Sequence, residues 1–165
     1  MNREEFDPRC KGSRLERFDS PVASRSPTVK ISAVVRNGQA RHDVTVSTAD
    51  SIKALPVPPK AGGRGSSVNG GEFLMLALAT CYCNDVYREA ARLNLDVQEV
   101  EVEAAADFDG VGLAARNVRY RARIRSSEPK DKLDLLLKET DAVAEVQNTL
   151  RAAAGVTMVP WDAGV

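Results

Sequence analysis

The chain has 165 residues, of which 43% are hydrophobic and 28% charged, a composition typical of a globular protein with one sizeable core. Lysine plus arginine and aspartate plus glutamate each number 23, so the formal net charge is zero and no bulk attraction to nucleic acid or to an anionic membrane is expected. The longest apolar stretch, residues 73–79, is far shorter than the roughly 18 residues of a membrane-spanning helix. We therefore expect a cytoplasmic protein that binds neither nucleic acid nor membrane.

The three cysteines, Cys10, Cys81 and Cys83, are too few and too unevenly spaced for the disulfide framework of a secreted domain. No apolar segment of a signal peptide precedes them. His42 is the single histidine, so a zinc site could contain at most one imidazole ligand. The sequence therefore predicts no metal and no cofactor, and a cysteine here is either a packing residue or a reactive group.

The first part of the chain divides into a tail and a hairpin. Residues 1–28 mix charges of both signs with three prolines and few apolar residues, so we expect a flexible tail before a single domain over 29–165. Alternating side chains over 29–35, followed by Asn37-Gly38, predict a strand and a hairpin turn, with the partner strand over 42–47. Residues 55–71 are rich in glycine and proline and are predicted to form a long loop of the kind that often carries function.

Asn69 and Glu72 form a capping-box pattern, which predicts that a helix begins here. Neither proline nor glycine interrupts 72–93, and the first half is apolar almost all round, so we expect a helix buried on most sides. Two antiparallel strands (97–103 and 118–125), two helices (from Pro129, and 143–153) and a closing strand (156–159) are predicted after it. This order predicts an α+β fold with antiparallel sheets around a buried central helix.

Cys81 and Cys83 lie two positions apart on the predicted helix, which places them about 200° apart around its axis. They therefore point to nearly opposite sides, and neither a disulfide between them nor a shared metal is favoured. Many cysteines in apolar helices only pack, and a reactive thiol needs a nearby cation or hydrogen-bond donors. The candidate cations are Arg36, His42 and Arg64; Arg64 could equally mark an anion site, although its glycine-rich loop does not fit a P-loop.

The glycine-rich loop, then Asn69-Gly70-Gly71-Glu72-Phe73-Leu74, then Ala77-Leu78-Ala79-Thr80-Cys81 resembles the OsmC/Ohr superfamily of osmotically inducible protein C and organic hydroperoxide resistance proteins. The resemblance covers roughly residues 29–159. It implies an OsmC-like α+β fold in an intertwined homodimer, with the active site at the dimer interface. It also implies thiol-dependent reduction of organic hydroperoxides in oxidative-stress defence, with Cys81 as the peroxidatic cysteine, Arg36 as the hairpin arginine and Glu72 as the glutamate at the helix start.

The sequence departs from this pattern at two positions. Ala144 stands where the family has its second, resolving cysteine, and Gly71 replaces the proline before the glutamate. We therefore expect a divergent, one-cysteine branch whose oxidised Cys81 is reduced by an external thiol. Glu145 and Cys83 are secondary candidates for the site, and Glu145 could pair with Arg36 or another cation. An apolar pocket is expected to favour organic peroxides, with side chains from Phe73, Leu74, Leu78 and Tyr82.

Two other functions remain open. One is a non-enzymatic OsmC-like protein that binds a small apolar or electrophilic ligand at the dimer interface. The other is hydrolytic or transfer chemistry with Cys81 as nucleophile, for which His42 is the clearest general base. A peroxidase needs the pKa of Cys81 well below the reference value of about 8.5, whereas a binding protein does not.

Overall fold

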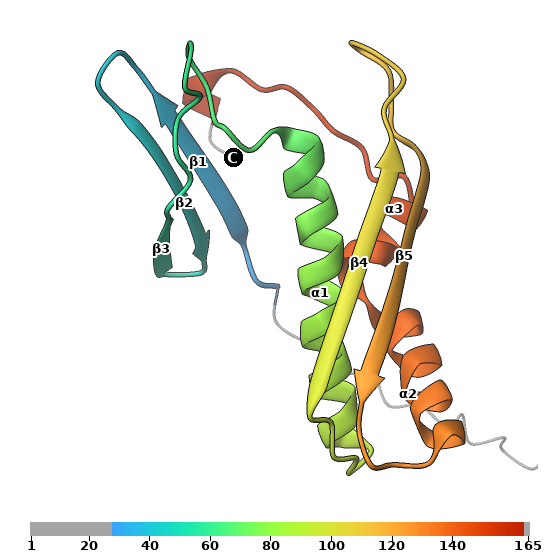
Figure 1. The fold of residues 1–165 in the computed structure, drawn as a ribbon. Helices are drawn as coiled ribbons and strands as arrows, with labels where there is room; N and C mark the ends of the chain where they lie inside the picture. Colours follow the sequence, from blue (N-terminus) through green and yellow to red (C-terminus); the bar gives the residue numbers. More distant parts are fainter. Residues whose placement is uncertain (1–27, 164–165) are drawn as a thin grey trace, which may run out of the picture.

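The computed structural model describes residues 28–163. The predicted tail, with Cys10, lies outside the described residues except for Thr28. The described chain contains two antiparallel sheets and three α-helices, followed by a short 3-10 helix at Trp161–Ala163 (Figure 1). The predicted α+β class with antiparallel sheets is confirmed.

The first sheet has the order β1-β2-β3, formed by β1 (Ile31–Asn37), β2 (His42–Thr48) and β3 (Ser51–Leu55). The predicted hairpin is confirmed, and the Gly38 N–H closes its turn by donating to the Arg41 carbonyl at 2.8 Å. β3 was not predicted as a strand. In Figure 1 this sheet lies to one side of the central helix, and it makes no extensive packing contact with the helices or with the second sheet.

The central helix, α1 (Gly70–Arg92), begins as predicted. Asn69 Oδ1 accepts the Glu72 N–H at 3.0 Å and Glu72 Oε2 accepts the Asn69 N–H at 2.7 Å, which completes the capping box. One side of α1 packs against the second sheet and the later helices. The expectation of burial on most sides is wrong for the single chain, because Leu76 is 57% exposed and Tyr87 is 43% exposed. Their side of the helix is uncovered since the first sheet stands away from it.

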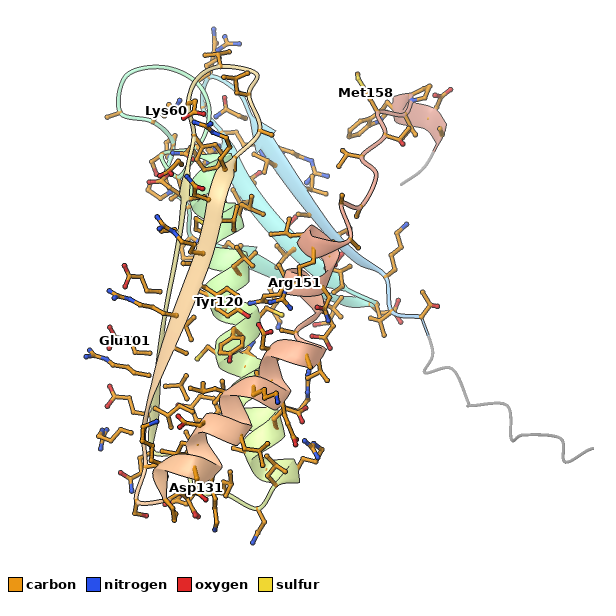
Figure 2. The ribbon with its side chains drawn as sticks, turned by 90° about the vertical axis from the view of Figure 1, so that its right-hand side faces the viewer. Lys60, Glu101, Tyr120, Asp131, Arg151 and Met158 are labelled. Carbon is orange, nitrogen blue, oxygen red and sulfur yellow. The ribbon has the colours of Figure 1, made fainter. Side chains whose placement is uncertain are left out.

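The second sheet pairs β4 (Glu99–Asp107) with β5 (Arg116–Arg125), close to the predicted strands. Strand alternation gives it two different faces. One face packs on α1 and carries the apolar residues, namely Val100, Val102, Tyr120, Ala122 and Ile124. The other carries cross-strand ion pairs such as Glu103–Arg121, and Figure 2 shows Glu101 pointing away from the helices. The core therefore lies between α1 and this sheet.

Two helices close the other side of the core: α2 (Lys130–Val143), which Pro129 precedes, and α3 (Glu145–Arg151). Leu136 of α2 is completely buried against α1. The predicted closing strand over 156–159 is wrong for the described chain, where the segment pairs with no strand and Val156 is 99% exposed. Within residues 28–163, no helix is both long and apolar enough to cross a membrane.

Candidate active site

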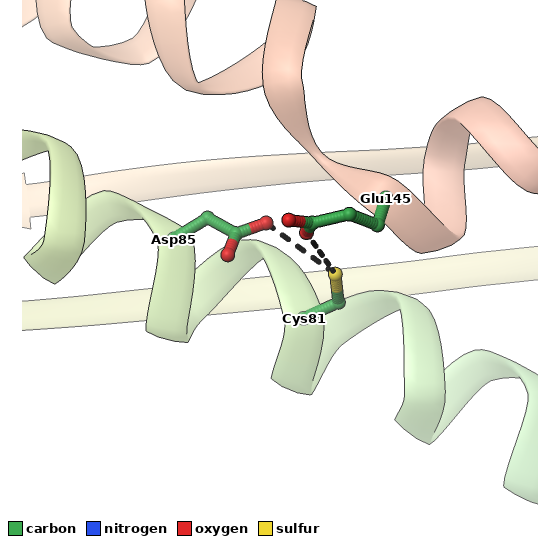
Figure 3. A group of neighbouring side chains, drawn as sticks. All are labelled: Cys81, Asp85 and Glu145. Carbon is green, nitrogen blue, oxygen red and sulfur yellow. Dashed lines mark hydrogen bonds between the residues drawn. The ribbon is translucent and has the colours of Figure 1, made fainter. Parts of the chain in front are cut away.

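Cys81 lies where the middle of α1 meets the start of α3. Its thiol donates to Asp85 Oδ2 at 3.4 Å, one turn further along α1 (Figure 3). Glu145 Oε2, which reaches over from the first residue of α3, lies 3.8 Å from the same sulfur. The thiol therefore sits between two carboxylates, of which Asp85 is the nearer.

Arg88 joins these carboxylates from the outside. Its Nη1 donates to Asp85 Oδ1 at 2.7 Å and to Glu145 Oε1 at 3.3 Å, while its Nε donates to Glu89 Oε1 at 3.2 Å. Asp85 is only 4% exposed, whereas Glu145 and Arg88 are open to solvent. Arg88 thus occupies one oxygen of Asp85 and leaves the other oxygen facing Cys81.

The surroundings of the Cys81 sulfur favour the protonated thiol. Burial raises the pKa of Cys81, and the charges of Asp85 and Glu145 raise it further, although the Val146 N–H that faces the sulfur opposes them. Burial also raises the pKa of Asp85; the Cys81 hydrogen bond and Arg88 lower it, and Glu145 raises it. The described chain alone therefore does not provide the activated thiolate that a peroxidase is expected to need.

Helix α3 is held in place by the residues that follow Ala144. Ala144 itself is fully buried, and Gln147 Nε2 donates to the Leu78 carbonyl one turn before Cys81 at 3.0 Å. Among residues 28–163, Gln147 Oε1 is buried and has no hydrogen-bond partner. These contacts bring the position after Ala144 beside Cys81, so Glu145 occupies the space next to the thiol and pairs there with Arg88.

Glu72 lies in the first turn of α1, more than two turns before Cys81. Its carboxylate accepts the Asn69 N–H in the capping box. A Cβ built at the neighbouring Gly71 would lie 3.0 Å from the ring of Phe108, so a larger residue here would require this ring to shift by a few tenths of an ångström. Met75 and Phe108 form an apolar groove next to Glu72, together with Ala106 of β4. The sequence did not identify this groove.

Arg36 lies near the end of β1, opposite Asp43 of β2. Within residues 28–163 it forms no ion pair with Glu72 and no hydrogen bond with Cys81, so one chain alone does not assemble the expected trio.

Instead of contacting Cys81, His42 fastens the glycine-rich loop to the hairpin. Ser66 Oγ lies 3.0 Å from its Nε2, and Asn37 Nδ2 lies 3.1 Å from its Nδ1. Asn37 Oδ1 accepts the Gly65 N–H, so its amide donates to Nδ1 and the Nε2–H of His42 donates to Ser66. In this tautomer His42 cannot accept a proton from Ser66. Arg64, the other candidate cation, lies exposed in this loop.

The residues predicted to line a substrate pocket differ in their burial. Leu78 and Tyr82 are buried, and the Tyr82 hydroxyl donates to the Leu137 carbonyl at 2.7 Å. Burial, with help from the Asp141 charge, raises the pKa of Tyr82 to about 12. Phe73 is half-buried. Cys83 is a half-buried free thiol, so it forms no disulfide with Cys81.

Cys81, Asp85 and Glu145 also place one sulfur and two carboxylate oxygen atoms within 4.8 Å of one another. Acidic groups of this kind are common without a metal ion, and Arg88 already supplies a positive charge to both carboxylates. A cation bound here would compete with Arg88 for the two carboxylates.

Asp85 and Arg88 are the functional candidates that sequence analysis did not single out. The four-residue spacing put Asp85 on the same ridge as Cys81, which was the available signal. Arg88 gave no comparable signal, because its partner Glu145 is 57 residues away in the sequence.

The fold of the chain is similar to those of several solved structures. The chain is similar in structure to an OsmC-like protein from Mycoplasma pneumoniae, with 16% identity, a TM-score of 0.54, and coverage of 76% of this chain and 88% of the other. An organic hydroperoxide resistance protein OsmC from Legionella pneumophila gives 16% identity, a TM-score of 0.49, and coverage of 73% and 89%. An organic hydroperoxide resistance protein from Elizabethkingia anophelis, with thiocyanate bound, gives 15% identity, a TM-score of 0.48, and coverage of 78% of this chain and 91% of the other.

At these identities the Mycoplasma likeness supports the fold alone. No curated protein sequence matches the chain significantly. The OsmC-like protein family matches residues 63–159, which is more than half of the chain and includes α1, both strands of the second sheet and the late helices. The chain therefore belongs to the OsmC-like protein family.

Proposed function

We propose that this protein reduces organic hydroperoxides with the Cys81 thiol, as a cytoplasmic homodimer in oxidative-stress defence. The observation that carries the proposal is the position of Cys81: a partly exposed thiol on the family's central helix, with a proton acceptor, Asp85, at 3.4 Å. Sγ attacks the terminal oxygen of the hydroperoxide, the O–O bond breaks, and the products are a cysteine sulfenic acid and an alcohol. The Val146 N–H beside the sulfur stabilises negative charge that develops there.

The sulfenic acid is then reduced by an external thiol. Ala144 provides no resolving sulfur, and Cys83 lies on a different side of α1. One small thiol condenses with the sulfenic acid, which releases water and leaves a mixed disulfide. A second thiol then attacks the sulfur of the first, so that the two small thiols leave as a disulfide and Cys81 is restored as the thiol.

A second copy of the chain completes the site in this proposal. The first sheet stands apart from its own α1, and its apolar Ile31 and Val35 are exposed, as are Leu76 and Tyr87 of α1. Covering these surfaces by a partner would bury apolar area and could bring Arg36 of the second copy to Cys81. A guanidinium there would lower the pKa of Cys81, opposing the burial and the carboxylates that raise it in one chain.

The second candidate function is ligand binding without peroxide chemistry. The raised pKa of Cys81 favours it, because a binding protein needs no thiolate. The apolar groove of Met75, Ala106 and Phe108 would then be a part of the ligand site.

Turnover separates the two functions. With cumene hydroperoxide and an excess of dithiothreitol, we expect peroxide consumption that Cys81→Ser abolishes and Cys83→Ser preserves. Consumption that is equal in the wild type and Cys81→Ser would contradict the peroxidase and leave ligand binding as the function.

A further inference from the structure

The contact between Cys81 and Asp85 offers a route for the thiol proton. Asp85 is almost completely buried, and its two oxygens have separate partners. Oδ1 accepts from Arg88 at 2.7 Å, and Oδ2 accepts the Cys81 S–H at 3.4 Å. The carboxylate is therefore held so that one oxygen faces the sulfur.

We propose that Asp85 is the general base for Cys81 and that Arg88 is its positioning residue. In peroxide reduction, which rests on the function proposed above, Asp85 Oδ2 takes the thiol proton as the S–O bond forms. It then passes this proton to the alkoxide oxygen that leaves as the O–O bond breaks. The hydroperoxide's own proton stays on the transferred oxygen, so Cys81–SH and ROOH become Cys81–SOH and ROH without a further reactant.

The electrostatics of the site make such a base useful. In the single chain the pKa of Cys81 is raised above its usual range, so a reaction that depended on a preformed thiolate there would use a small fraction of the protein. The groups that act on Asp85 are Cys81 and Arg88 from α1 and Glu145 from α3. Burial raises the pKa of Asp85, which makes its carboxylate a stronger base than a solvated aspartate.

A purely electrostatic role for Asp85 predicts the opposite effect of its removal. The carboxylate charge raises the pKa of Cys81, so neutralising it would increase the thiolate fraction and speed the reaction. A base, in contrast, is needed for the reaction, so its removal slows it. The direction of the change in Asp85→Asn therefore decides between the two roles.

The test uses alkylation of the full-length chain by iodoacetamide, because this reaction needs the thiol but no peroxide. A Cys10→Ser/Cys83→Ser background leaves Cys81 as the only thiol, and EDTA removes any metal. Rates are measured by mass spectrometry from about pH 5 to 9. With Asp85 intact, we expect the alkylation rate to reach a plateau as the pH rises. In Asp85→Asn we expect a rate about 10²-fold lower at pH 7, which rises about tenfold per pH unit.

Two further variants separate the base from a general effect on folding. Glu139→Gln removes one carboxylate that bonds Arg92 rather than Cys81, and we expect it to keep the wild-type profile. Arg88→Gln removes the guanidinium that lowers the pKa of Asp85, so the acid limb of the profile is expected to move to higher pH. A rate for Asp85→Asn equal to or above the wild-type rate, or an unmoved acid limb in Arg88→Gln, would overturn the proposal.

The outcomes also separate this inference from the proposed function. Asp85-dependent alkylation combined with peroxide reduction no faster than that of a free thiol would keep the base and reject the peroxidase. Rapid peroxide reduction that Asp85→Asn leaves unchanged would keep the peroxidase and reject the base.

Discussion

The Cys81 thiol and the Asp85 carboxylate form a donor–acceptor pair at 3.4 Å, one turn apart on the central helix. The carboxylate is buried, and Arg88 holds it from the far side. A thiol in this position is protonated yet has an acceptor for its proton. The reactivity of Cys81 is therefore expected to depend on Asp85 as well as on any cation that a second copy supplies.

Asp85 is expected to lower the free energy of unfolding near neutral pH. Burial raises its folded pKa above the unfolded value, so its contribution to stability is present below the unfolded pKa and is lost as pH rises through the folded pKa. At pH 7 the charged group therefore lowers the free energy of unfolding. We expect Asp85→Asn to unfold at higher urea than the wild type at pH 7, with the difference shrinking towards pH 3. A lower midpoint at pH 7 would show that the Arg88 ion pair outweighs the burial.

Glu89, in contrast to Asp85, is expected to raise the free energy of unfolding near neutral pH. Hydrogen bonds from Arg92 and Arg88 lower its folded pKa, so its stabilising contribution is present above the unfolded pKa and is lost as pH falls through the folded one. Glu89→Gln should therefore flatten the loss of stability below about pH 4.5 in urea unfolding. Glu101→Gln, which removes the same charge from the exposed outer face of β4, is the matched control. An acid limb that stays unchanged in Glu89→Gln would contradict this assignment.

Gly71 is predicted to be required by its contact with Phe108. A Cβ at position 71 would lie 3.0 Å from that ring, so Gly71→Ala should lower the free energy of unfolding by about 1–3 kcal/mol. Gly70→Ala meets no atom within 4 Å and should be neutral or stabilising by up to about 1 kcal/mol. Thermal unfolding measures both, and Phe108→Leu should restore part of the loss in Gly71→Ala. Equal effects at the two glycines would argue against the close contact.

The uncovered side of α1 predicts a homodimer. In sedimentation velocity we expect the wild type to be dimeric, because the exposed Leu76 and Tyr87 need apolar cover. Leu76→Glu/Tyr87→Glu should shift the protein to the monomer by placing charges on this surface. Val111→Glu, at a fully exposed position in the β4–β5 connection, is the control and should remain dimeric. A monomeric wild type would contradict the dimer.

Local patterns were sufficient to predict much of the fold. The Asn37-Gly38 turn, the capping box at Asn69 and the alternating side chains of β4 and β5 each depend on near neighbours, and the structure contains all of these elements. β3 was missed because Ala49 occupies its turn with a positive φ of 49°, where glycine or asparagine would have given a signal. The segment 156–159 has strand-like alternation, but no strand of the described chain pairs with it.

The site was only partly predictable, because some of its contacts lie within one helix and others depend on tertiary packing. Cys81 and Asp85 share a helix, and their four-residue spacing was a local signal that could have placed them together. Glu145 was named because it follows Ala144 in the late helix, and the structure brings it to the thiol through the packing of α3 on α1. The ion pairs of Arg88 depend on that tertiary packing, which no local pattern encodes.

The most direct test of the account is sulfenic-acid trapping at Cys81. The protein is treated with one equivalent of cumene hydroperoxide and a sulfenic-acid probe, and the modified residue is located by mass spectrometry, with Cys81→Ser and Cys83→Ser as controls. We predict oxidation at Cys81 that is much faster than for a free thiol and that persists in Cys83→Ser. Oxidation of Cys81 at the rate of a free thiol would contradict peroxide reduction by this protein.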